Sequence, residues 1–235
     1  MPGWTQVAPS SLVQDPTLFA RDNFRAVAYR NNITGELVVA FRGTQEIGDL
    51  VADMNQFDGH DSRTYRDAIA LASALALENP NDDITFTGHS LGGGLATAAA
   101  LQTGEQAVGF NSAALTEDSA DLYGLDLNDA NTQVTHLLVP GEAVTALQET
   151  AMPAPPDPFP MDPDNPPDRP WVTHPAPGMR HVLDPPDQSV INQAVAGFPM
   201  AVNLLLPRDA EESIAAHLMV SVMSSLHNTY NARCP

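Results

Sequence analysis

One stretch of the sequence, residues 84–101, constrains the fold of this chain more than any other. It reads ITFTGHSLGGGLATAAAL, so a short β-rich run meets Gly88-His89-Ser90-Leu91-Gly92 and continues directly into an Ala- and Leu-rich segment. That order predicts a strand, a tight turn and a helix. A serine hydroxyl is a weak nucleophile unless a base can reach it, and flanking glycines let the backbone pass closely around an exposed corner. The stretch therefore predicts that Ser90 is a nucleophile.

The predicted helix after Ser90 adds a second element of the same chemistry. Its N-terminal end directs the positive end of the helix dipole, and the free N–H of Leu91, toward the place where an oxyanion would form. Leu91 is therefore a candidate oxyanion donor. The same pentapeptide also occurs as a plain glycine-rich connection between a strand and a helix, but the β-rich run before it and the helical segment after it favour the catalytic interpretation.

Composition limits the other classes of function. A chain of 235 residues is long enough for one substantial α/β domain. Its formal charge of −19 comes from 29 acidic and 10 basic residues, and the sequence contains no lysine, so nucleic acid is an unlikely partner class on electrostatic grounds. Cys234 is the single cysteine and excludes an intrachain disulfide.

The N-terminal residues do not resemble a signal peptide. MPGWTQVAPSSLVQDP lacks a basic start and an unbroken apolar core. The most apolar window, residues 190–206, is interrupted by polar residues and proline, so no transmembrane segment is expected. The cellular location stays open: the protein is expected either to be exported by a dedicated secretion system or to be part of a longer chain.

Apolar patterning predicts alternating strands and helices around Ser90. Turn residues between the first two apolar runs indicate an antiparallel hairpin, and residues 112–131 read as acidic and irregular. The expected strands are 24–30, 36–42, 84–87, 107–111 and 134–139, and the expected helices are 47–57 and 64–78.

Proline density changes abruptly in the last third of the chain. More than half of the 21 prolines fall between Pro153 and Pro186, which excludes helix interiors and central strands there. We interpret residues 151–187 as an insert or cover, with a return to strand near 179–183, followed by a helix over 189–206 and a final helix that starts near Asp209 or Ser213. The acidic stretch Asp157–Asp168 lacks the turn glycine and spaced glutamate of a calcium loop and is expected to be a solvated loop.

Three blocks of the sequence together resemble a known family. VVAFRGTQEIGDLVADM, ITFTGHSLGGGLA and AVGFNSA are similar to the corresponding blocks of fungal-type triacylglycerol lipases (lipase class 3-like α/β-hydrolases) and their bacterial relatives, including phospholipase effectors. The likeness covers residues 24–142 well. It implies an α/β-hydrolase fold over 1–235, a single domain with a mainly parallel central sheet flanked by helices and a proline-rich insert.

The resemblance also assigns the oxyanion hole and the acid. The hydroxy residue after Arg-Gly supplies the second oxyanion donor in the family, and Thr44 occupies that position; its alternative role is a cap of the 47–57 helix. The acid follows a later strand, where relatives show Gly-Asp-Pro-Val and this chain reads Gly141-Glu142-Ala143-Val144. Either carboxylate can orient an imidazole, so Glu142 is the expected acid, with Asp126 and Asp129 as competitors.

The chain contains 7 histidines that compete for the role of base. Relatives place the base near the start of the final helix in a pattern like His-hydrophobic-Met, which His217-Leu218-Met219 matches. His89 is expected to be a packing residue within the turn. The remaining histidines either precede the acid or lie elsewhere in the later segments: His60, His136, His174, His181 and His227.

The resemblance implies a serine hydrolase that cleaves acyl esters of lipids or phospholipids through an acyl-enzyme on Ser90. This mechanism requires no metal and no organic cofactor. The implied partners are a lipid or phospholipid substrate, transient contact with a membrane surface and, for an effector, a cognate inhibitor protein. The alternatives are a small-ester esterase or thioesterase, or a catalytically disabled hydrolase-like binding module.

Overall fold

The structure is a computed structural model in which residues 3–43, 62–142, 144–145, 176–191, 221–226 and 228 are described. An 8-stranded sheet forms the centre of this part of the chain. Its strands are β1 (Trp4–Val7), β2 (Ala20–Arg21), β3 (Phe24–Asn31), β4 (Leu37–Phe41), β5 (Ile84–His89), β6 (Gln106–Phe110), β7 (Val134–Leu138) and β8 (Met179–Val182).

The strand order is β1-β3-β4-β5-β6-β7-β8, with β2 paired to β3. β1, β3 and β4 pair antiparallel, and every pair from β4 to β8 is parallel. The expected hairpin is therefore present, and β1 adds an edge strand that the sequence did not indicate. Because parallel strands end at one edge, the residues that follow β4, β5, β6 and β7 meet there. We call this side of the sheet the C-terminal edge.

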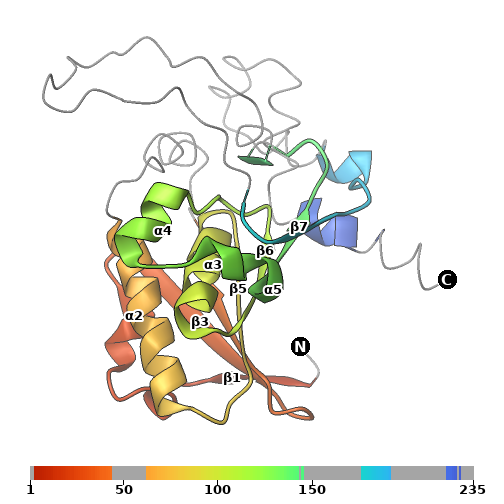
Figure 1. The fold of residues 1–235 in the computed structure, drawn as a ribbon. Helices are drawn as coiled ribbons and strands as arrows, with labels where there is room; N and C mark the ends of the chain where they lie inside the picture. The colour runs from red at the N-terminus through yellow and green to blue at the C-terminus, as the bar shows by residue number, and fades with distance from the viewer. Residues whose placement is uncertain are drawn as a thin grey trace, which may run out of the picture.

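Helices connect the parallel strands. They are α2 (Arg63–Glu78), α3 (Leu91–Thr103), α4 (Glu117–Tyr123) and α5 (Ala130–Gln133). Right-handed crossovers between strands in sequential order place successive helices on one face of a sheet. Accordingly α2 packs on α3, and α3 lies on β5 and β6, so the two long helices stand in front of the sheet in Figure 1.

Helix α2 forms because its apolar residues recur at helical spacing. Tyr65, Ala68, Leu71, Ala72 and Leu75 are buried along one face. At its end the Asn79 side chain donates to the Leu75 carbonyl (3.0 Å), and Pro80 follows. The observed range matches the expected 64–78 helix.

Helix α3 is apolar on every side and is buried accordingly. All its residues from position 92 to position 100 are buried, and the helix ends at Gly104 in the left-handed conformation (φ 82°). It packs against α2, β5 and β6, which together cover most of its surface. The helix that begins beside Ser90 is therefore part of the core, which fixes its position relative to the strands.

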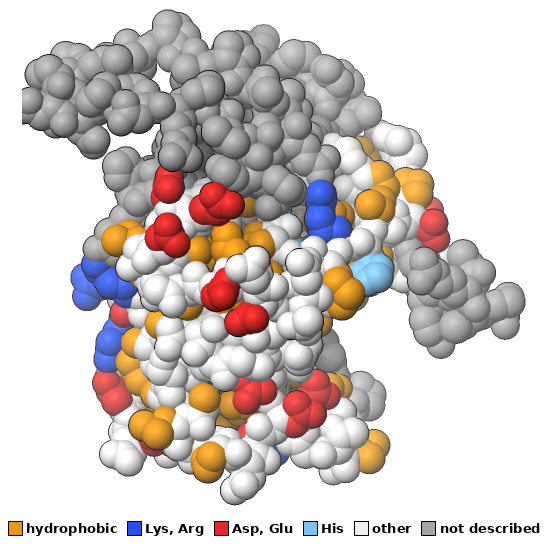
Figure 2. Space-filling model, in the orientation of Figure 1, with side chains coloured by type: hydrophobic (Ala, Val, Ile, Leu, Met, Phe, Trp, Pro, Cys, Tyr) orange, Lys and Arg blue, Asp and Glu red, His pale blue; other side chains and the backbone are white. Residues whose placement is uncertain are grey.

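The sheet buries one face under these helices. Residues in register alternate between buried and half-buried, so the buried members of neighbouring strands lie on the same face. Phe24, Phe41 and Phe86 form the aromatic centre of that layer, with ring centroids 5.8 and 5.9 Å apart. On the outer surface, Figure 2 shows acidic side chains spread over the visible face, as the net charge predicts.

The expectation of irregular structure over 112–131 was wrong. Helix α4 and the short α5 occupy much of this range, with a 3-10 turn at Leu127–Asp129. The Thr116 side chain caps α4 by accepting the Ser119 N–H (3.2 Å), acidic residues occupy its first turn, and Gly124 ends it with φ 69°. Acidic residues that resemble a loop by composition are here favourable at a helix N-terminus.

The later segments are described in part. β8 confirms the expected return to strand near 179–183, and it pairs with β7 at the edge of the sheet. Residues 188–191 and 221–226 are helical, within the two expected C-terminal helices. The predicted 47–57 helix, the starts of the last helix and most of the 151–187 insert lie outside the described residues.

Candidate active site

Ser90 lies at the corner between β5 and α3. Its backbone has φ 57° and ψ −125°, a conformation that costs on the order of 1–3 kcal/mol and persists only where the surroundings enforce it. Hydrogen bonds supply that constraint: the Ser90 N–H donates to the Phe110 carbonyl (3.0 Å), and the Ser90 carbonyl accepts from Gly93 (2.9 Å) and Ala113 (3.0 Å). This strained strand-to-helix corner is the geometry of a nucleophile elbow.

The Ser90 hydroxyl is buried, although the sequence predicts an exposed corner. The residue is 3% exposed, and its Oγ has no hydrogen-bond partner within the described part of the chain. An unpaired buried hydroxyl costs about 1–3 kcal/mol, so its retention requires a physical reason. The hydroxyl is therefore available to a base or a substrate.

Glycines allow this corner to pack against the end of β4. A Cβ atom on Gly88 would collide with the Gly92 carbonyl, and one on Gly92 would collide with the Phe41 carbonyl. A Cβ atom on Gly43 would likewise collide with the His89 carbonyl. The glycines of the pentapeptide and of the Arg-Gly-Thr block therefore serve one arrangement, which brings the end of β4 beside the N-terminus of α3.

The first turn of α3 presents N–H groups at the same place. The Gly93 and Gly94 N–H groups bond to the Ser90 carbonyl (2.9 and 3.4 Å), so Leu91 precedes the internal ladder of the helix. Because α3 is buried, its dipole acts where screening by water is weak. The Leu91 N–H therefore lies next to Ser90 and ahead of the first internal hydrogen bond of the helix. Thr44, the second predicted donor, directly follows Gly43 and lies outside the described residues.

Glu142 follows β7 at the C-terminal edge. Its side chain is fully buried, and its carboxylate oxygens accept the N–H groups of Val144 (2.9 Å) and Thr145 (2.6 Å). Its own N–H donates to the Val139 carbonyl (3.3 Å). Charge-assisted bonds of this kind hold the carboxylate in one orientation. Since Ser90 follows β5 and Glu142 follows β7, the two residues lie at the same edge of the sheet, two strands apart.

The competing acids lie at the other end of β7. Asp126 and Asp129 are exposed and precede α5, which leads into the N-terminal end of β7. The Asp126 carboxylate accepts the Asn128 N–H (2.9 Å) as the cap of a 3-10 helix. The length of a strand separates both residues from the edge that carries Ser90. The geometry therefore favours Glu142 over both alternatives.

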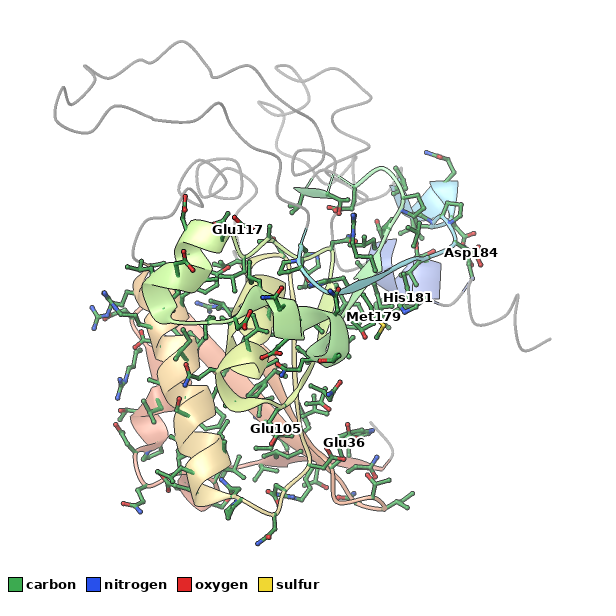
Figure 3. All side chains as sticks on the ribbon, in the orientation of Figure 1. Glu36, Glu105, Glu117, Met179, His181 and Asp184 are labelled. Carbon is green, nitrogen blue, oxygen red and sulfur yellow. The ribbon has the colours of Figure 1, made fainter. Side chains whose placement is uncertain are left out.

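The structure describes three of the 7 histidines, His89, His136 and His181. His89 is half-buried at the end of β5, as expected for a packing residue. His181 (labelled in Figure 3) is exposed on β8, three strands along the sheet from β5. His217, the predicted base, lies outside the described residues, as do His60, His174 and His227, so the base assignment stays a prediction.

His136 is a buried structural residue. Its Nε2 lies 3.0 Å from the Pro177 carbonyl, which can only accept, so Nε2 carries the proton. Its Nδ1 then accepts from the Ser112 hydroxyl (3.0 Å). Ser112 Oγ in turn fills the space that Cβ atoms on Gly93 and Gly109 would need. This cluster of Ser112, His136 and Pro177 joins the end of β6, the middle of β7 and the segment before β8.

The His136 cluster predicts a dependence of stability on pH. Burial, together with the positive charge of Arg180, lowers the pKa of His136 to about 4 although the bond to Pro177 opposes the shift. An unfolded histidine titrates near pH 6.5, so below that pH the unfolded state binds more protons than the folded state. The free energy of unfolding should fall by about 3 kcal/mol as the pH decreases from about 6.5 to about 4.

Urea titrations across this range test the prediction with two variants. His136→Gln should lower stability at pH 7 and flatten the dependence between pH 6.5 and 4. His181→Gln is the matched control, because its ring is exposed in the folded protein, and it should keep the wild-type slope. Equal slopes for His136→Gln and the wild-type protein would show that another group governs the dependence.

Two residues of the C-terminal edge were missed by the sequence interpretation. Asn111 and Ser112 directly follow β6, are fully buried and bond to β7. The sequence signal that could have indicated them is a pair of polar residues immediately after an apolar strand. In the described ranges, no group of His, Cys, Asp or Glu side chains could hold a metal ion. The acidic stretch Asp157–Asp168 lies outside those ranges.

A nucleophile elbow at the C-terminal edge of a mainly parallel sheet, with a buried carboxylate after a later strand, defines an α/β-hydrolase. The chain belongs to the family described as "Phospholipase-like: Tle-like phospholipase domain", whose profile matches residues 1–157. This family is of the lipase/phospholipase type, as the resemblance predicted. No helix in the described ranges is long and apolar enough to cross a membrane.

Among individual proteins, the chain is similar to an extracellular phospholipase A1 of Serratia liquefaciens. The two are 36% identical over 129 residues, which cover 53% of this chain and 40% of the relative. The chain thus spans about two fifths of the length of that enzyme.

Two solved structures of fungal lipases are also similar. A native Rhizomucor miehei lipase propeptide complex aligns at 15% identity with a TM-score of 0.37 and covers 52% of this chain and 47% of that chain. Lip2 lipase of Yarrowia lipolytica aligns at 16% identity with a TM-score of 0.37, covering 61% and 60%. The fold assignment rests on the strand order and the elbow rather than on these scores.

Proposed function

We propose that this protein hydrolyses carboxylic acyl esters of phospholipids through an acyl-enzyme on Ser90. The observation that carries the proposal is the Ser90 corner: a strained backbone, an unpaired buried hydroxyl and the N-terminus of a buried helix coincide there. A merely structural turn would gain nothing from retaining both the strain and the unpaired hydroxyl. Family membership and the likeness to a phospholipase A1 support the substrate class.

In the proposed mechanism Ser90 Oγ attacks the ester carbonyl while His217 Nε2 takes the hydroxyl proton. Collapse of the tetrahedral intermediate breaks the bond to the alkoxy group, which receives that proton and leaves as the lysophospholipid. Water then attacks the acyl-serine ester and gives a proton to His217, which passes it to Ser90 Oγ as the bond to the acyl group breaks and the fatty acid leaves. Glu142 would hold the imidazole in the required tautomer by accepting its Nδ1 proton.

The tetrahedral oxyanion would be stabilised by the Leu91 N–H and the Thr44 hydroxyl. The first turn of α3 and the end of β4 lie side by side, so donors from both can converge on one oxygen. No metal or organic cofactor enters these steps.

The substrate experiment uses phosphatidylcholine vesicles with distinguishable acyl chains at the two glycerol positions. We expect release of the sn-1 fatty acid, on the likeness to the phospholipase A1, and fluorophosphonate labelling of the peptide that contains Ser90. Hydrolysis of short soluble esters without phospholipid hydrolysis would support the esterase alternative. A protein that neither hydrolyses esters nor takes up the label would be a disabled module.

Thr44 is predicted to act on the transition state. Thr44→Val keeps the shape of the side chain and removes the donor, so kcat should fall on the order of 100-fold while KM changes little. Thr44→Ser, which keeps a hydroxyl, is the matched control and should retain most of the activity. A Thr44→Val enzyme with wild-type kcat and a lower Tm would indicate a helix cap instead.

We further propose that the domain acts outside the cell that makes it, as an exported effector that contacts a membrane surface transiently. The name of the Serratia relative, an extracellular enzyme, supports export. A phospholipase endangers the membranes of its producer, so an effector of this kind requires a cognate inhibitor protein. Growth of cells that express the wild-type protein or a Ser90→Ala variant, in the cytoplasm or directed outside it, tests this: only the active enzyme should be toxic.

A further inference from the structure

Asn111 lies where β6 leaves the sheet, between the strands that lead to Ser90 and Glu142. It is fully buried and has φ 44°, a left-handed conformation that few residues other than glycine and asparagine adopt readily. The backbone therefore turns sharply at this residue. A buried turn at the C-terminal edge must still satisfy the polar groups of the neighbouring strand.

The Asn111 side chain, in place of the Asn111 backbone carbonyl, accepts the next hydrogen bond of the β6–β7 ladder. Phe110 pairs with Leu137, so residue 111 lies opposite Leu138 if the register continues. A parallel ladder would then join the Asn111 N–H to the Leu137 carbonyl and the Val139 N–H to the Asn111 carbonyl. The first bond is present at 3.0 Å, but in place of the second the Val139 N–H donates to Asn111 Oδ1 (2.8 Å).

Because the side chain accepts this bond in place of the backbone carbonyl, the backbone after Asn111 can turn toward Ser90. Two residues later the Ala113 N–H donates to the Ser90 carbonyl (3.0 Å), and the Ser90 N–H already donates to Phe110 just before Asn111 (3.0 Å). Asn111 thus lies within the short backbone segment that brackets Ser90 from both sides.

The same side chain holds the segment that ends at Glu142. Val139, whose N–H it accepts, provides the carbonyl that receives the Glu142 N–H (3.3 Å). Val139 is buried, so without Asn111 Oδ1 its N–H would lose its acceptor, and the turn from 139 to 142 would have to shift to recover one. A single amide group therefore connects the Ser90 corner to the Glu142 turn.

We propose that Asn111 is a positioning residue, whose side chain sets the separation between the nucleophile and the acid by ending the β6–β7 ladder. The inference rests on the proposed function of Ser90 and Glu142. Asn111 would act through the backbone of both strand ends and would not touch the substrate. A displacement of about 1 Å between catalytic groups can reduce the rate on the order of 100-fold, so the loss of this amide should appear in kcat rather than in KM.

Two substitutions separate the conformation of Asn111 from its acceptor. Asn111→Gly tolerates the left-handed φ but removes the acceptor, and Asn111→Asp tolerates it and keeps an acceptor of the same length. We expect kcat on phosphatidylcholine to fall about 100-fold in Asn111→Gly with KM within about threefold. Asn111→Asp should recover kcat to within about tenfold of the wild-type value.

Asn31→Gly is the matched control. Asn31 Oδ1 also accepts backbone N–H groups, those of Ile33 (2.9 Å) and Thr34 (3.2 Å), but in the β3–β4 turn at the opposite edge of the sheet. The Asn31→Gly variant should have a lower Tm and an unchanged kcat. Amide hydrogen exchange on the same proteins should speed up at Val139 and Glu142 in Asn111→Gly and remain close to the wild-type rate in Asn111→Asp.

The outcomes separate this inference from the function on which it rests. If the wild-type enzyme is active and Asn111→Gly keeps its kcat, or if Asn31→Gly loses kcat equally, Asn111 has no positioning role. Failure of Asn111→Asp to recover kcat while exchange at Val139 stays protected would also overturn the role. A wild-type protein without hydrolysis or fluorophosphonate labelling would refute the proposed function itself, and the positioning role with it.

Discussion

Ser90→Ala is expected to reduce phospholipid hydrolysis by at least about 1,000-fold and to remove fluorophosphonate labelling. The reason is chemical: alanine has no atom that can form the acyl-enzyme. Fatty acid release under saturating substrate, followed by mass spectrometry, measures the loss. Turnover close to the wild-type value would show that another residue is the nucleophile.

The stability of Ser90 variants provides a second, independent measurement. Because Ser90 Oγ is buried and has no partner among the described residues, Ser90→Ala should leave the free energy of unfolding unchanged or raise it by about 1 kcal/mol. Ser90→Gly should be more stable again by about 1 kcal/mol, since glycine adopts φ 57° and ψ −125° without a Cβ penalty. A less stable Ser90→Gly would mean that the corner is not strained.

Glu142→Gln is expected to lower kcat on the order of 10,000-fold. Glutamine is nearly isosteric with glutamate, but its amide is neutral, so it is a weaker acceptor for the imidazole N–H. The amide can also present an N–H where an acceptor is needed. The Val144 and Thr145 N–H groups would also lose a charged acceptor, so we expect a drop in stability of about 1–3 kcal/mol. His217→Ala should abolish turnover to a similar extent.

Glu36→Gln is the control that separates charge loss from catalysis. The Glu36 carboxylate accepts the Thr85 hydroxyl (3.1 Å) in a partly buried bond, at the end of the sheet opposite Glu142. Figure 3 shows Glu36 at the lower end of the molecule, near Glu105 and far from α4. Glu36→Gln should change the free energy of unfolding and leave kcat unchanged. A Glu142→Gln enzyme with kcat within tenfold of the wild-type value would exclude Glu142 as the acid and reopen the choice of carboxylate.

Local pattern was sufficient for most of the sheet and the elbow. The hairpin, α2 and the strands β5 to β8 follow the expected ranges to within a few residues. In all of these except the exposed β8, apolar residues recur at the period of the element and turn residues follow it. The pentapeptide around Ser90 predicted its own corner, since the glycines that permit it lie within two residues of the serine. The α/β-hydrolase class and the lipase-like family, confirmed here, follow from those blocks in order.

Segments whose conformation depends on caps were predicted less well. The range 112–131 contains acidic residues typical of loops, and only the cap at Thr116 and the left-handed Gly124 make a helix of Glu117–Tyr123. The catalytic roles of five residues stay predictions: Ser90, Thr44, Leu91, Glu142 and His217. The organisation of 1–235 as one domain with 151–187 as an insert or cover also stays a prediction.

The sequence by itself determined the local conformation at Ser90, because the strand, turn and helix there are encoded by neighbours along the chain. Only the tertiary structure decided how they are held. Burial in the core lowers the pKa of His136 and keeps the ring neutral, and its partners Ser112 and Pro177, 24 and 41 residues away, hold the ring in place. Asn111 joins two strand ends through Val139, 28 residues away. Periodicity and turn chemistry report local interactions, whereas burial and hydrogen bonds between distant residues exist only once the sheet has formed.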